Sequence, residues 1–107
     1  MNLTRAYGKA LKSALPGSTQ RERALAVGIN SGTMCAVEAG KEHVTLERAH
    51  RYATSLGYRL HVTLTTPGAA PQRITPTRDV RDVTLDQLDG IARAINATTN
   101  LALQARS

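Results

Sequence analysis

The segment 19–40, TQRERALAVGINSGTMCAVEAG, constrains the fold most, because it has the pattern of two short helices joined by a tight turn. Its apolar residues recur with a helical period that breaks at Gly28. Glycine adopts a positive φ without steric cost, as a chain leaving a helix often requires. Asn30 then offers a side-chain oxygen to the free N–H groups of a new helix. The pattern predicts helices over 20–27 and 31–38.

Two more helices are predicted on either side of this pair. Apolar residues recur at helical spacing over 3–15, and Pro16-Gly17 then stops that helix. A second stripe follows a Thr45 cap over 46–56. The N-terminal part of the chain is therefore predicted to be a bundle of short helices.

The spacing in this region resembles the helix-turn-helix of the lambdoid phage repressor and Cro (XRE-type) family, over roughly residues 4–57. The matching residues are Thr19-Gln20, Ala24, Val27-Gly28-Ile29, Met34, Val37-Glu38 and Gly40-Lys41. The resemblance implies a mainly α fold, a lambda-repressor-like bundle of four to five short helices. One departure is Arg23, where the family usually has a leucine that packs on the first helix.

The resemblance also implies which side chains contact DNA. Bases would be contacted by the outward residues of the helix over 31–38, which are Ser31, Gly32, Thr33, Cys35 and Ala36. Phosphates would be contacted by Thr19, Gln20, Asn30, Lys41 and His43. This base-reading face departs from the family because it has no long amide or guanidinium and offers no bidentate pair to a base. A helix that has lost DNA binding and serves only protein contacts therefore stays open.

Residues 58–65, YRLHVTLT, alternate between apolar and polar side chains, which predicts one half-buried strand. A single strand needs a partner edge for its backbone groups. We expect that partner to be the same strand of a second chain, with Tyr58, Leu60, Val62 and Leu64 at the dimer contact. An XRE-type domain followed by such a strand resembles the antitoxins of the HipB type. Pairing with 72–76 of the same chain is the alternative.

The rest of the chain is predicted to be a linker over 66–83 and a helix over 84–107. The linker is rich in Pro, Gly, Ala and Thr, and Thr84-x-x-Gln87 forms a capping box for the helix. The apolar face of this helix packs on the domain, pairs across a dimer or docks on another protein. The expected organisation is a DNA-binding domain over 1–57, a dimerisation strand over 58–65, this linker and a C-terminal helix.

Charge and composition favour a nucleic-acid partner. The net charge is +6, and residues 1–78 hold eleven Lys/Arg against four Glu. The single cysteine and the lack of a long apolar run indicate a reducing compartment, no membrane segment and a cytoplasmic protein. No catalytic motif, metal-ligand spacing or cofactor motif is visible.

These features predict a dimeric transcriptional regulator, a repressor that binds double-stranded DNA at a palindromic operator. The alternative is an antitoxin or antiactivator that binds a toxin or activator protein through its C-terminal helix.

Overall fold

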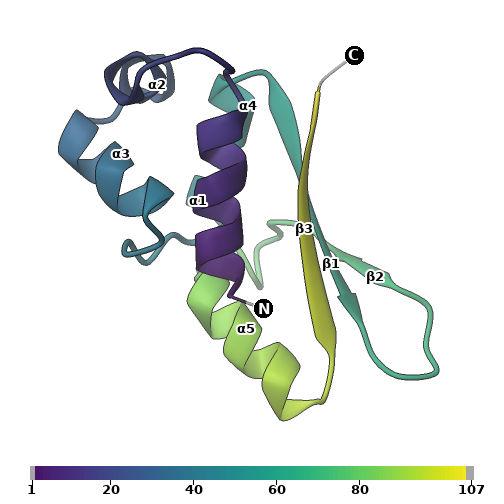
Figure 1. Cartoon of the computed structure of the whole chain (residues 1–107). Helices are drawn as coiled ribbons and strands as arrows, with labels where there is room; N and C mark the ends of the chain where they lie inside the picture. The colour runs from purple at the N-terminus through teal and green to yellow at the C-terminus, as the bar shows by residue number, and fades with distance from the viewer. Residues whose placement is uncertain (1, 106–107) are drawn as a thin grey trace.

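Four helices come first in the chain, and strands and a fifth helix follow them (Figure 1). The computed structural model describes residues 2–105. The elements are α1 (Leu3–Ser13), α2 (Gln20–Val27), α3 (Ser31–Glu38), α4 (Leu46–Ser55), β1 (Tyr58–Thr65), β2 (Gln72–Ile74), α5 (Leu85–Ala94) and β3 (Thr98–Ala105). The bounds predicted for α2, α3 and β1 are confirmed, and those of α1 and α4 differ only at their C-terminal ends.

The strands form one antiparallel sheet in the order β2-β1-β3, with β1 in the centre. β3 pairs with β1 over its whole length, from Tyr58 opposite Ala105 to Thr65 opposite Thr98, and β2 pairs with β1 over Val62–Leu64. The predicted fold class, mainly α with one strand and a C-terminal helix, is therefore wrong.

The predicted pairing of β1 with a second chain is also wrong, because both of its edges have partners in the same chain. Three of the side chains expected at that dimer contact belong to the chain's own core: Leu60 and Val62 are buried, and Tyr58 packs against this core and donates its hydroxyl to the Ala14 carbonyl at 2.7 Å. Leu64 is half-buried. The alternative pairing with the 72–76 segment is confirmed for β2.

The predicted C-terminal helix ends early because the chain reverses after α5. Asn96 has a φ of +58°, and the Ala97 N–H donates to the Ala92 carbonyl at 2.7 Å. Asparagine tolerates this left-handed conformation better than most residues. The threonines and asparagine that follow are poor helix formers, and in β3 they gain a full ladder to β1.

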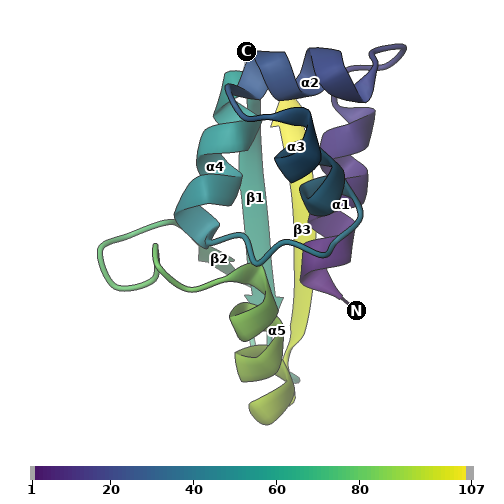
Figure 2. The same cartoon turned by 90° about the vertical axis from the view of Figure 1, so that its left-hand side faces the viewer.

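The helices cover one face of the sheet. α1 and α4 lie between the sheet and the α2–α3 pair, as the two views in Figures 1 and 2 show. The largest fully buried side chains come from α1, α3, α4, β1, α5 and the loop before α4; they are Tyr7, Leu3, Leu11, Met34, Leu46, Leu85, Val37, Val44 and Val62. The segments expected to be a domain, a strand and a separate helix thus share one core.

α5 is fixed to the N-terminal helices by backbone and side-chain hydrogen bonds. The Leu85 N–H donates to the Val44 carbonyl at 2.9 Å, and the Leu46 N–H donates to the Val83 carbonyl at 2.8 Å. The buried Asp89 carboxylate accepts from the Leu3 N–H at the N-terminus of α1, where the helix dipole favours an anion. One side of α5 (Leu85–Ala94) therefore packs on the rest of the chain.

Within the described residues, no helix is both long and apolar enough to cross a membrane.

Candidate nucleic-acid interface

Local hydrogen bonds set the bounds of α2 and α3. Thr19 and Glu22 form a capping box at the start of α2, in which the Thr19 hydroxyl accepts from the Glu22 N–H at 3.2 Å. Gly28 ends α2 with a φ of +84°, and its N–H donates to the Ala24 carbonyl at 2.9 Å. The Asn30 side chain then accepts from the Thr33 N–H at 2.7 Å and caps α3. The two helices are thereby joined by a turn of three residues, Gly28 to Asn30, whose first position only glycine enters easily.

A buried ion pair ties α2 to α3. Arg23 Nε and one terminal nitrogen donate to the two Glu38 carboxylate oxygens at 2.6 and 3.1 Å, and the side chains are 6% and 4% exposed. The other terminal nitrogen donates to the Ser18 carbonyl at 2.8 Å. Glu38 raises the pKa of Arg23 through its hydrogen bonds, and burial partly opposes this. The residue that departs from the family pattern therefore has a structural role in the α2–α3 pair.

α1 crosses the C-terminal end of α3 at very short range. A Cβ on Gly8 would lie 2.4 Å from the Val37 carbonyl oxygen and 2.7 Å from that of Glu38. A Cβ on Gly40 would likewise lie 3.0 Å from Arg5 Cα. α3 is therefore seated directly on α1, and Arg5 lies beside the loop that follows α3.

The outward face of α3 is open to solvent. Ser31, Gly32 and Cys35 are exposed, Thr33 and Ala36 are half-buried, and Met34 and Val37 point into the core. The described part of the C-terminal segment packs elsewhere, with α5 and β3 against α1. In Figure 2, α3 faces the viewer with no element in front of it. The chain thus leaves the side chains expected to read bases accessible to another molecule.

The side chains expected to contact phosphates fall into two groups. Three are engaged within the chain: Thr19 and Asn30 as helix caps, and Gln20 as a donor to Glu38 at 3.3 Å. Lys41 and His43 are exposed in the loop after α3.

The two loop residues differ in their surroundings. His43 lies 3.9 Å from the Asp86 carboxylate, whereas no ion pair involves Lys41 among residues 2–105. Lys41 is therefore the stronger candidate for a phosphate contact.

Sequence reasoning did not identify Arg5 as a further cation beside Lys41 and His43. Its only signal is that it lies off the apolar stripe of the first helix. Arg5 is exposed, and its backbone lies beside Gly40, next in sequence to the exposed Lys41. Two cations next to α3 suit a polyanion.

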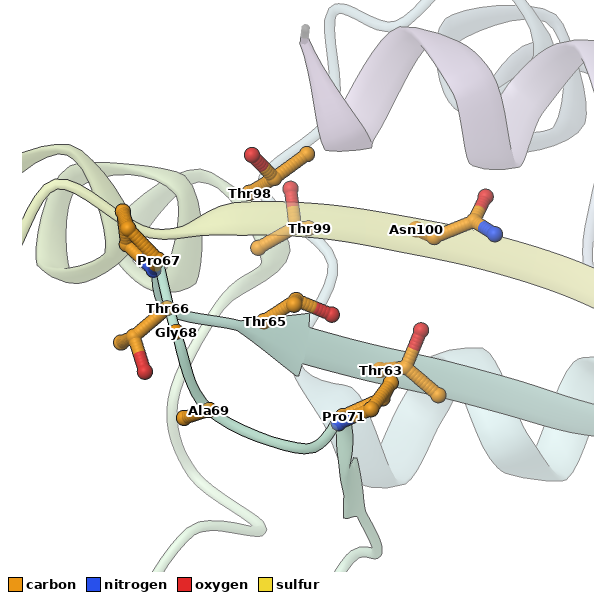
Figure 3. A pocket seen from close by; sticks show the side chains of 10 residues that line it. All are labelled: Thr63, Thr65, Thr66, Pro67, Gly68, Ala69, Pro71, Thr98, Thr99 and Asn100. Carbon is orange, nitrogen blue, oxygen red and sulfur yellow. The ribbon is translucent and has the colours of Figure 1, made fainter.

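One hollow lies away from α3. It has a volume of about 710 Å³ and lies between the β1–β2 turn and the start of β3 (Figure 3). Its walls are threonine, proline and other small residues without ionisable side chains: Thr63, Thr65, Thr66, Pro67, Gly68, Ala69, Pro71, Thr98, Thr99 and Asn100. This lining offers no general acid, base or charged group for catalysis.

Among residues 2–105, no three His, Cys, Asp or Glu side chains lie close enough together to hold a metal ion.

Comparison with known proteins gives no match to any family model, curated protein or solved structure.

Proposed function

We propose that this protein is a DNA-binding regulator of transcription that resembles the XRE-type regulators and reads DNA with α3. The observation that carries the proposal is the open face of Ser31, Gly32 and Cys35 on a helix that is rigidly seated on α1 and α2. A recognition helix enters the major groove with its N-terminal residues foremost. In α3 these residues are small, so the helix backbone and its hydroxyls approach the base edges closely.

Affinity in this proposal comes mainly from phosphates. The α3 face has no side chain that makes a bidentate pair with a base, each of which is worth about 1–3 kcal/mol of discrimination. Arg5 and Lys41 supply charge beside the groove, and residues 1–78 carry eleven cationic against four anionic side chains. Binding is then strongly dependent on salt, and DNA shape contributes to specificity.

The test is DNA binding measured by fluorescence anisotropy over a series of salt concentrations, first with genomic fragments and then with a selected operator. Replacing Lys41 by Ala should weaken binding about equally on all sequences and lower the salt slope by about 1. Arg59→Ala is the matched control, because Arg59 is exposed on the sheet, which α1 and α4 separate from α3. An unchanged slope for Lys41→Ala would exclude its phosphate contact.

A second candidate function is a protein-interaction module, such as an antitoxin or antiactivator that keeps the helix-turn-helix. Two observations favour it: the short side chains on α3, and two isoleucines that are about half exposed, Ile91 on α5 and Ile95 at its C-cap. No binding of the folded protein to any duplex at low salt would favour this candidate over a DNA-binding regulator.

A further inference from the structure

α5 has an apolar outer face that nothing in the described chain covers. Its buried side, with Leu85, Leu88 and Ala92, packs into the core. The opposite side, termed here the α5 outer face, consists of Gln87, Gly90, Ile91 and Ala94 together with the C-cap residue Ile95. Ile91 is 49% and Ile95 is 51% exposed. A hollow of about 530 Å³ is lined by part of this face together with Val83.

The glycine in the middle of this face has no role within the chain. A Cβ on Gly90 would meet no atom within 4 Å, so the fold has room for alanine there. Glycine is a poorer helix former than alanine, and its presence in a helix interior weakens α5. The space that it leaves next to Ile91 suits a second helix that approaches closely.

A second copy of the same helix fits this space. When two copies of α5 lie antiparallel about a two-fold axis between Gly90 and Ile91, the same flanks of the helices meet, so Gly90 of each copy faces Gly90 of the other and Ile91 faces Ile91. Gln87 of each copy then faces Ala94 of the other. The two glycines thus allow close approach of the helices on one flank, and the two isoleucines form an apolar contact on the other.

The charges on α5 also favour a second copy of the same helix in the antiparallel orientation. Asp86 and Arg93 are seven residues apart, nearly two turns, so they lie on one flank of the outer face. In an antiparallel pair the same flanks of the two helices meet. Asp86 of each copy therefore faces Arg93 of the other, which gives two symmetric ion pairs.

Neither charge has a close ionic partner inside the described chain. Asp86 has only the exposed contact to His43 at 3.9 Å, and no ion pair of Arg93 is present among residues 2–105. Both groups are thus free to pair across the interface.

We propose that the α5 outer face is the homodimer interface of this protein, formed by two antiparallel copies of α5 with Asp86 facing Arg93 across the axis. The proposal deepens the proposed function, since it supplies the two-fold symmetry of a palindrome reader in place of the β1 pairing. It leaves the outward face of α3 free, because α5 packs mainly against α1 and β3.

The experiment is sedimentation equilibrium of the full chain without DNA, at concentrations up to about 0.3 mM. Wild type should be a dimer. Asp86→Arg and Arg93→Asp should each weaken the dimer by roughly tenfold, since each puts like charges together twice by symmetry. The double variant D86R/R93D should recover most of the wild-type affinity. Far-UV circular dichroism checks that each variant is folded.

Two further variants, one in the interface and one control outside it, complete the test. Gly90→Ala should raise the melting temperature measured at a concentration where the chain is monomeric, and it should also weaken the dimer because its methyl group fills the space at Gly90. Leu25→Glu is the control, because Leu25 is an exposed apolar residue on α2, outside the outer face. It should leave the association unchanged.

Three results would overturn the proposal: a monomeric wild type over the whole concentration range, a double variant no tighter than the single ones, or a Gly90→Ala dimer as tight as wild type. The last two results would point to the open edge of β3 or to another surface. A dimer that behaves as proposed but binds no duplex would support this interface and contradict the proposed function, so the two failures are distinguishable.

Discussion

Removing one partner of the Arg23–Glu38 pair should destabilise the protein far more than an ordinary polar substitution. Both side chains are almost fully buried, so the remaining partner would keep an uncompensated charge inside the protein. Such a loss typically costs 3–5 kcal/mol, whereas an exposed pair contributes about 0–1 kcal/mol. Because a domain is stable by only about 5–15 kcal/mol, either single substitution would take a large part of the total.

The hydrogen bonds left behind rank the two substitutions. Arg23→Leu leaves the Glu38 carboxylate with a single donor, Gln20 at 3.3 Å. Glu38→Leu leaves the Arg23 guanidinium with the Ser18 carbonyl at 2.8 Å and the Ser18 hydroxyl at 3.0 Å. We therefore place Arg23→Leu near 5 kcal/mol and Glu38→Leu near 3 kcal/mol, as approximate values within the range for broken buried pairs.

The double variant R23L/E38L carries neither charge. Replacing a buried pair by apolar side chains is often nearly neutral, so the double variant should be more stable than either single one. The coupling free energy from this cycle should then exceed about 3 kcal/mol, which is at or above the usual range for residues in contact.

The assay is urea unfolding followed by far-UV circular dichroism, with all variants at one low protein concentration. Arg21→Leu is the matched control, because Arg21 is exposed on the same helix and should change stability by less than about 0.5 kcal/mol. A cost below about 1 kcal/mol for Arg23→Leu, or additive single costs, would refute the view that this pair locks α2 to α3.

Two other predictions concern α1. Tyr7 is fully buried, its hydroxyl donates to the Ala49 carbonyl at 2.7 Å, and burial raises its pKa well above the ordinary value of about 10. Above about pH 10 the unfolded chain therefore loses a proton that the folded chain retains, so this contribution to stability should fall by about 1.4 kcal/mol per pH unit. Urea titrations from pH 9 to 11 should show a steeper fall for wild type than for Tyr7→Phe, and equal slopes would contradict the burial argument. Gly8→Ala should destabilise the fold by several kcal/mol, because its methyl group meets the Val37 backbone oxygen at 2.4 Å and a helix backbone yields little; a melting temperature equal to that of wild type would show that α1 does not cross α3 so closely.

The sequence predicted elements whose signals are local. The Thr19, Gly28 and Asn30 signals act on neighbouring residues, and the observed bounds of α2 and α3 match the predicted ones. The Tyr58–Thr65 alternation likewise predicted a strand with the correct ends. Each of these patterns determines its own conformation largely without help from distant parts of the chain.

Partners far along the chain were harder to predict. Alternation in β1 shows that one face is buried, but it does not say which segment supplies the hydrogen bonds. The 98–105 segment carries both a weak helical stripe and an alternation of Thr99, Leu101 and Leu103. The hydrogen-bond ladder to β1 favours the strand over the helix. The local sequence of 98–105 does not show that this ladder exists. The Arg23–Glu38 pair was missed for the same reason, because its residues belong to different helices.

Packing contacts through α1 connect the outward face of α3 rigidly to the α5 outer face. α3 is seated on α1 through the close approach at Gly8, and α1 is held to α5 through the Asp89 carboxylate at the Leu3 N–H. A protein interior packed at crystal-like density deforms little, so the relative positions of its packed helices are nearly fixed. If two copies join along α5, the distance and orientation between their α3 helices are therefore set by α1, which touches both surfaces. That distance must match one turn of DNA, about 34 Å, or a multiple of it.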